Sequence, residues 1–160
     1  MAVARYLRDV DCRSQAVVIV FFDEEEQGEL GSNAFAQLLV GDGRPVTAAY
    51  TADQLGWDQD GDRAIEIERP DGDLLQQLQA SDDAGGFGLP LLQTNTGGTD
   101  HVAFRAHGID AAGFSEEYVN GDTTPYYHQP TDTVDTVDFD YLAAATSLVA
   151  YHFARITTAP

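Results

Sequence analysis

Apolar and polar residues alternate along the chain in blocks that predict strands separated by helices. The longest apolar block, residues 16–22, is rich in β-branched and aromatic side chains, which is typical of a strand buried on both faces of a sheet. Shorter strands are predicted over 45–51, 64–68 and 109–114. Because a strand buried on both faces needs cover above and below, we expect helices on each side of the sheet.

Apolar side chains at helical spacing predict the helices between these strands. They are expected over residues 1–7, 33–40, 71–80 and 100–107, with a last helix starting near Asp138. This order predicts a three-layer α/β sandwich with a mostly parallel central sheet and helices on both faces. A chain of 160 residues suits a single domain, residues 1–160.

The charge balance narrows the range of partners. The chain has 27 Asp and Glu against eight basic residues, all of them Arg, for a net charge of −19. Nucleic acid is excluded as an expected partner, because binding to it depends on cationic side chains that neutralise phosphates. The acid is spread through loops such as 58–62 and 81–83. Such self-repulsion weakens a compact state at low salt, so we expect a protein from a salt-rich environment.

Targeting signals and membrane segments are not evident in the sequence. No apolar run approaches the roughly 20 residues that cross a bilayer. Met1 is followed by no basic segment with an apolar core and a cleavage site. We therefore expect a soluble chain without a signal peptide or membrane span. The single Cys12 cannot pair internally and is interpreted as an inert thiol. Export and oligomeric state stay open.

Polar residues that could carry chemistry follow the predicted strands. Glu25 and Glu26 follow the long apolar block, Asp53 follows the next strand, and His128 lies in the loop after the last strand. In α/β sheets, ligands bind beyond the carboxyl ends of the strands. Carboxylates and imidazole are the ligands of zinc in hydrolytic sites, where a further glutamate can take a proton from water. Two adjacent glutamates can divide these roles.

Each of these residues also has a simpler interpretation. The acidic run 23–26 could favour the positive N-terminus of the following helix. Asp53 could be a turn residue, and His128 a loop histidine beside Tyr127 and Pro130. The alternating Asp residues of loop 58–62 resemble part of a calcium loop, but the glycine and glutamate of the full pattern are missing.

Four sequence blocks resemble the zinc aminopeptidases of metallopeptidase family twenty-eight. Residues 18–32 are similar to its strand, Glu-Glu and Gly-x-x-Gly-Ser block, and residues 53–56 to its Asp-Met-Ile-Gly segment. Residues 99–104 are similar to its Ser-Asp-His block, and 126–133 to its Tyr-His-Thr-x-x-Asp-Thr block. The blocks occur in the family's order over about residues 16–153.

The resemblance implies a role for each candidate in a site with two zinc ions. Glu25 would be the general base. Glu26 and His128 would bind one zinc, and Asp53 would bind the other.

Four further residues are implied around this centre. Glu116 would face the ammonium group of a peptide substrate, and Tyr127 would border the substrate pocket. Asp100 and His101 would support the site without binding metal, and we expect the side chain of Asp100 to hydrogen-bond the start of its helix.

The chain also departs from the family pattern. Members carry a His-x-Asp segment and an Asp-Asn-Ala motif before the Glu-Glu block, and this chain has neither. We therefore expect an N-terminally incomplete zinc peptidase domain that lacks strands and part of the ligand set. Such a chain should be nearly inactive by itself and should expose a sheet edge or an apolar patch.

The leading hypothesis is a metal-dependent aminopeptidase that removes N-terminal residues from peptides. One alternative is a catalytically inactive relative that serves as a binding or assembly module. Another is an aminoacyltransferase of the glutaminyl cyclase type. The residue preference, and whether the missing ligands reflect truncation or natural loss, cannot be decided from this sequence.

Overall fold

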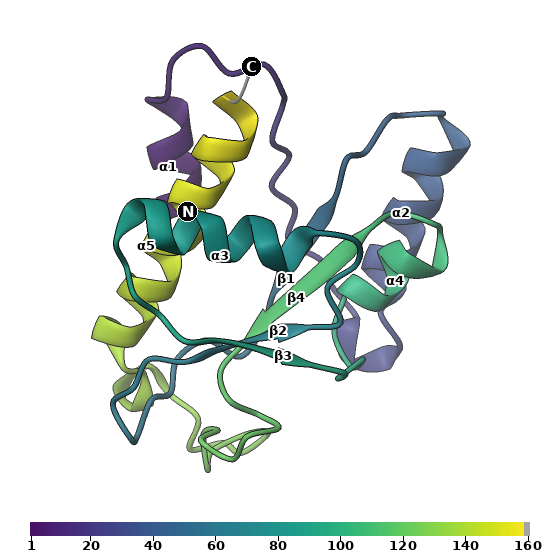
Figure 1. Ribbon diagram of the computed structural model, residues 1–160. Helices are drawn as coiled ribbons and strands as arrows, with labels where there is room; N and C mark the ends of the chain where they lie inside the picture. Colours follow the sequence, from purple (N-terminus) through teal and green to yellow (C-terminus); the bar gives the residue numbers. More distant parts are fainter. Residues whose placement is uncertain (159–160) are drawn as a thin grey trace.

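A mixed four-stranded sheet forms the centre of the protein, shown in Figure 1 for the computed structural model, which describes residues 1–158. Its strands, in spatial order, are β1 (Ala49–Ala52), β4 (Ala111–Ser115), β2 (Ile65–Glu68) and β3 (Leu91–Thr94). β1 is parallel to β4 and β2 is parallel to β3, whereas β2 runs antiparallel to β4. The predicted sheet is therefore present, and its central pairing is antiparallel.

Helices cover both faces of this sheet, as predicted. α1 (Ala2–Arg8), α3 (Leu74–Gly85) and α5 (Phe139–Thr158) lie on one side in Figure 1, and α2 (Leu30–Gly41) and α4 (His101–Ala106) lie on the other. Two short 3₁₀ helices, η1 (Glu25–Gln27) and η2 (Val134–Thr136), lie in the loops. No helix within residues 1–158 has the length and apolar character that a membrane span requires.

Two apolar clusters hold these layers together. The larger one joins Ile67 and Phe114 of the sheet to Leu78 of α3 and Leu148 of α5. The smaller one packs Ala36 of α2 and Phe104 of α4 against Ala111. Burial of these side chains supplies most of the favourable free energy of folding.

The start of α5 has a clear physical cause. The Asp138 carboxylate accepts hydrogen bonds from the backbone N–H groups of Asp140 and Tyr141, both at 2.9 Å. These bonds satisfy donors that the first turn of a helix otherwise leaves unpaired. The buried Tyr141 also donates a 3.0 Å hydrogen bond to the carbonyl of Ala64, which ties α5 to the residue before β2.

Residues 16–22 do not form the buried strand that their composition predicts. The segment has no strand assignment, and Val18 and Phe21 are 73% and 77% exposed. Phe22 is half-buried, with its ring 5.7 Å from Phe35 and 5.9 Å from Phe104. A strand buried on both faces needs sheet neighbours and covering helices, and in residues 1–158 β1 pairs with β4 alone. The prediction of a central strand is therefore wrong for this structure, and the expected exposed apolar patch is present.

Candidate metal centre

A tight acidic turn places Glu25 and Glu26 in η1, directly after the exposed segment 16–22. The turn needs left-handed backbone at Glu24, with φ of 55°, and at Gly28, with φ of 98°. Gly31 lets α2 start close to the turn, because an added Cβ would lie 2.7 Å from the carbonyl oxygen of Asp23. The glycines of this block thus fold the acidic residues back against the helix.

Asp53 is presented at the carboxyl end of β1, as expected. Its backbone N–H donates to the carbonyl of Phe114 at 3.1 Å, which fixes the end of β1 against β4. The next residue, Gln54, has a φ of 52°. Left-handed backbone at residues other than glycine is uncommon, and such strain concentrates at functional sites.

His128 approaches the acidic turn from the long loop after β4. Its Nε2 atom lies 2.7 Å from Oε1 of Glu26, which is 102 residues away in the sequence. The imidazole stacks on the ring of Tyr127, with centroids 3.8 Å apart, and His128 itself has a φ of 57°. The fold therefore joins two of the three predicted zinc ligands directly.

Two carboxylates of the candidate centre, Glu25 and Asp53, have raised pKa values. Burial, followed by the negative charges of Asp53, Glu26 and Asp100, raises the pKa of Glu25 to about 7. Burial also raises the pKa of Asp53, with further contributions from neighbouring carboxylates that include Glu26, Glu68 and Asp100. A cluster of carboxylates that repel one another, beside an imidazole, is a donor set that fits a divalent cation such as zinc.

The donor atoms of Glu26, Asp53 and His128 do not all lie close enough together to form one metal site. Within residues 1–158, groups of three donor atoms less than 4.8 Å apart occur only in the acidic loops, as Asp58, Asp60 and Asp122 and as Asp60, Asp62 and Glu117. Glu26 and His128 form a contacting pair, and Asp53 uses one oxygen to accept a hydrogen bond from the N–H of Gln54. Glu26, Asp53 and His128 therefore form no three-donor group within residues 1–158.

Asp100 differs from its predicted role. It precedes α4, yet its side chain makes no hydrogen bond to the helix start, and its buried Oδ1 atom has no partner within residues 1–158. The capping prediction is therefore wrong for this side chain. The carboxylate is left free because the first turn of α4 bonds to backbone carbonyls of residues 99 and 100 instead, through the N–H groups of Val102 and Ala103.

His101 is fully buried. Its Nδ1 atom lies 2.8 Å from Oγ1 of Thr99 and 3.5 Å from Oε2 of Glu68. Burial, with smaller contributions from Arg105 and Arg69, lowers the pKa of the imidazole to about 4. His101 is therefore neutral at physiological pH.

Glu116 and Tyr127 line a pocket of about 190 Å³ beside Asp53. The pocket is lined by Gln54, Leu55, Gly56, Glu116, Thr124, Tyr127, Asp132, Thr136 and Val137. Glu116 is buried, and both of its oxygens accept hydrogen bonds, from the N–H groups of Gly56, Trp57 and Thr124 and from the hydroxyl of Thr123. Its carboxylate thus holds two loops together at the pocket wall, and little of its bonding capacity is left for a substrate ammonium.

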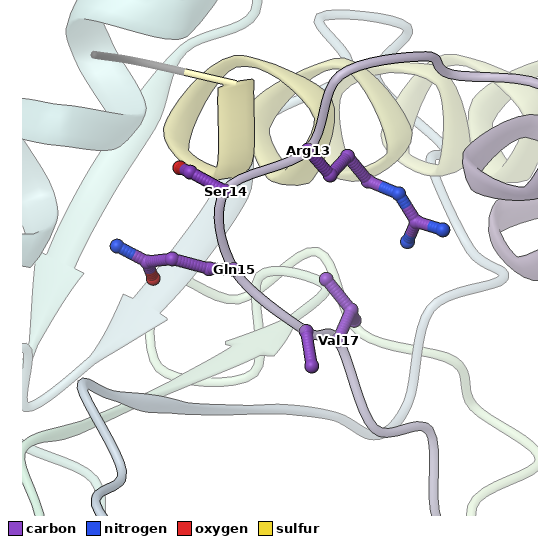
Figure 2. A pocket seen from close by; sticks show the side chains of 5 residues that line it. Arg13, Ser14, Gln15 and Val17 are labelled. Atoms are coloured by element: carbon purple, nitrogen blue, oxygen red, sulfur yellow. The ribbon is translucent and has the colours of Figure 1, made fainter.

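A second, wider hollow of about 400 Å³ lies along the exposed segment. Figure 2 shows Arg13, Ser14, Gln15 and Val17, which line it. None of the candidate site residues lines it. Its position beside residues 16–22 follows from the open surface left there.

One buried glutamate near the centre was not among the predicted site residues. Glu68, at the end of β2, is only 3% exposed, and its charge contributes to the raised pKa of Asp53. The Ile-Glu-Ile-Glu alternation of β2 usually indicates a sheet face in water. The sequence signal that could have identified Glu68 as a site residue is its position at the end of a predicted strand.

Comparison with known proteins identifies the family. Residues 1–153 match peptidase family M28, to which this chain belongs. The chain is 27% identical to Aminopeptidase YwaD of Bacillus subtilis (strain 168) over 154 residues, which are 93% of this chain and 33% of that protein. It therefore spans about a third of the length of this curated relative.

Solved structures agree on the fold. The zinc aminopeptidase BSAP from Bacillus subtilis superposes with a TM-score of 0.77 at 23% identity, over 87% of this chain and 35% of that one. A glutaminyl cyclase from Porphyromonas gingivalis is more distant, with a TM-score of 0.65 at 17% identity over 85% of this chain and 49% of that one. At these identities the similarity establishes the three-layer fold of the M28 aminopeptidases.

Proposed function

We propose that this chain carries part of the active site of a zinc-dependent aminopeptidase. The observation that carries the proposal is the 2.7 Å contact of His128 with Glu26, beside a glutamate whose pKa is raised to about 7. Membership of peptidase family M28 supports a hydrolytic role. The substrate would be a peptide with a free N-terminus.

In this proposal, metal binding and proton transfer are assigned to different residues. Glu26 and His128 hold one zinc ion and Asp53 holds the second, while Glu25 does not bind metal. Zinc supplies a Lewis acid that polarises a carbonyl and lowers the pKa of water. Glu25 takes a proton from the attacking water and passes it to the leaving amine, for which a pKa near 7 is well matched.

The pocket beside Asp53 is the proposed place for the N-terminal side chain of the substrate. Its lining combines apolar groups from Leu55, Val137 and Tyr127 with polar side chains such as Gln54 and Asp132. We assign Glu116 to holding the pocket loops, because four donors already bind its carboxylate. Tyr127 borders the pocket and stacks on His128, so it links substrate contact to the ligand pair.

The ligand set on this chain is incomplete in the proposal. Catalytic zinc usually has three protein ligands, and this chain offers two for one ion and one for the other. The isolated chain should therefore bind zinc weakly and turn over substrate very slowly. A catalytically inactive binding module is the competing proposal, and it predicts no specific zinc binding at Glu26 and His128.

Zinc titration by calorimetry tests the proposal. We expect the chain to bind zinc with a dissociation constant of micromolar or weaker, and His128→Ala to weaken binding by about tenfold or more. Glu25→Gln should retain binding within about threefold, because the proposed base is not a ligand.

His107→Ala is the matched control for this titration. His107 is half-buried directly after α4, and its Nε2 atom lies 2.9 Å from Oδ1 of Asn33, outside the candidate centre. Loss of binding in His107→Ala but not in His128→Ala would contradict the proposed site. Sub-micromolar binding by the unaltered chain would contradict the claim of an incomplete ligand set.

A further inference from the structure

A cluster of buried polar side chains lies between β2 and the start of α4. Oε2 of Glu68 accepts a 2.9 Å hydrogen bond from the hydroxyl of Thr99 and lies 3.5 Å from Nδ1 of His101. The hydroxyl of Thr99 is also 2.8 Å from Nδ1 of His101, so the three side chains contact one another. Glu68 and His101 are 3% and 0% exposed. Burying a carboxylate is costly unless it has such partners.

The sheet leaves room for this cluster at one position. A Cβ atom added to Gly113 of β4 would overlap Oε2 of Glu68 and would lie 3.0 Å from Nδ1 of His101. Gly113 is paired with Glu68 across the antiparallel strands. A glycine in the interior of a strand marks close approach of another group, here the carboxylate and the imidazole.

Asp100 lies between the two residues that Glu68 contacts. Its own side chain forms no bond to the helix, and its Oδ1 atom is buried without a partner within residues 1–158. α4 packs against β1, which ends directly before Asp53, so Asp100 at the start of α4 lies close to the candidate centre. Something other than its own hydrogen bonds must hold it there.

We propose that Glu68 is a positioning residue that clamps Thr99 and His101 and thereby holds the Asp100 carboxylate toward the candidate metal centre. The clamp acts on the backbone, since residues 99 and 101 flank Asp100 on both sides. This inference rests on the proposed function only for the claim that the centre near Asp100 binds metal. The clamp itself can be measured in metal-free protein.

Glu66 provides a matched control on the same face of the same strand. It is 0% exposed, and its Oε1 atom accepts hydrogen bonds from the N–H groups of Val119 and Asn120. Glu66→Gln therefore perturbs a buried glutamate without touching the start of α4. Any effect shared by variants at both positions reflects general loss of structure.

Amide hydrogen exchange in metal-free protein tests the clamp. In α4, Val102 and Ala103 donate to the carbonyls of Thr99 and Asp100 at 3.1 Å and 3.2 Å. We expect Glu68→Ala and Thr99→Val to speed exchange at these two amides by tenfold or more. Glu68→Gln, whose amide oxygen can still accept from Thr99, should recover part of the protection, and Glu66→Gln should leave these amides unchanged. Unchanged exchange in Glu68→Ala and Thr99→Val, or equal acceleration in Glu66→Gln, would overturn the proposal.

Zinc affinity, measured by competition with a chelator, is the second readout. We expect Glu68→Ala to lose about tenfold to a hundredfold in affinity, and Glu66→Gln to stay within twofold of the unaltered chain. Faster exchange without a change in affinity would overturn the link from the clamp to the metal centre. An unaltered chain that binds no zinc would contradict the proposed function, and the exchange comparison would then decide the role of Glu68 by itself.

Discussion

Single carboxylates and imidazoles in this protein take their chemistry from burial and from their neighbours. Glu25 has a raised pKa because it is partly buried and faces other carboxylates, whereas His101 and His152 have lowered pKa values because burial disfavours their charged form. Burial therefore shifts the two residue types in opposite directions: it makes Glu25 a candidate base and keeps His101 and His152 neutral. Environment, which the sequence encodes only through the fold, decides between these roles.

Stability should depend on pH through the buried His152 of α5. Burial lowers the pKa of His152 to about 4, with a smaller contribution from Arg155, against about 6.5 in an unfolded chain. As the pH falls below 6.5 the unfolded chain takes up a proton that the folded chain refuses, so stability falls between pH 6.5 and 4. Relative to pH 7, we expect a loss of about 2–3 kcal/mol from this group at pH 4.5.

Urea unfolding at pH 7 and at pH 4.5 measures this loss. His152→Gln removes the titrating group, although it also disturbs the 3.0 Å contact of His152 with Ser81. The variant should be less stable at pH 7 yet lose clearly less stability on acidification than the unaltered chain. An identical loss in both proteins would show that His152 is not the group responsible.

The sequence located the candidate residues better than it described their surroundings. Glu26 and His128 meet as the family pattern led us to expect, because short motifs at strand ends reflect local chemistry. The unbonded side chain of Asp100 was not predictable because it depends on how the first turn of α4 bonds. The burial of Glu68 was not predictable because it depends on contacts with the start of α4, which is distant in the sequence. The Ile-Glu-Ile-Glu sequence of β2 does not indicate that the face with the two glutamates is buried.

Secondary-structure elements followed the sequence where their signals are local. The last helix starts where Asp138 was expected to begin it, because a capping carboxylate acts within one turn. Residues 16–22 failed as a strand, because an extended segment becomes a strand only through partners elsewhere in the chain. The composition of a segment indicates its preference for extended structure, but it does not show whether a neighbouring strand is present.

The exposed segment offers a direct test at the scale of one element. Phe21 is 77% exposed, while its neighbour Phe22 packs on Phe35 and Phe104. We expect Phe21→Ser to change the free energy of unfolding by less than about 0.5 kcal/mol, and Phe22→Ser to cost about 2 kcal/mol or more. Urea unfolding of the two variants, side by side, measures the difference.

Equal destabilisation by both substitutions would mean that Phe21 is also buried in solution. The segment would then have found a partner that the fold described above does not provide. Gel filtration of the unaltered chain would show whether a second copy supplies it.

At the scale of the whole molecule, a net charge of −19 opposes compactness. Salt screens repulsion between exposed charges, with a Debye length of about 10 Å at 0.1 M and about 3 Å at 1 M. We therefore expect the melting temperature to rise by roughly 5 °C or more between dilute buffer and molar KCl. Differential scanning calorimetry over this range provides the measurement, and a constant melting temperature would remove the argument for a salt-rich environment.

The same acidity makes the location of zinc the central question. The acidic loops around Asp60 bring three carboxylates within 4.8 Å and could collect a cation without any catalytic meaning. The proposed centre instead lies where segments from opposite ends of the chain meet at Glu26 and His128. Only a measurement that places the ion separates these cases.

Anomalous scattering at the zinc edge, from crystals of the chain grown with zinc, makes that measurement. We expect an anomalous peak between the Glu26 carboxylate and the His128 imidazole, and its loss in His128→Ala. A peak confined to Asp58, Asp60 and Asp122, with none at His128, would contradict it.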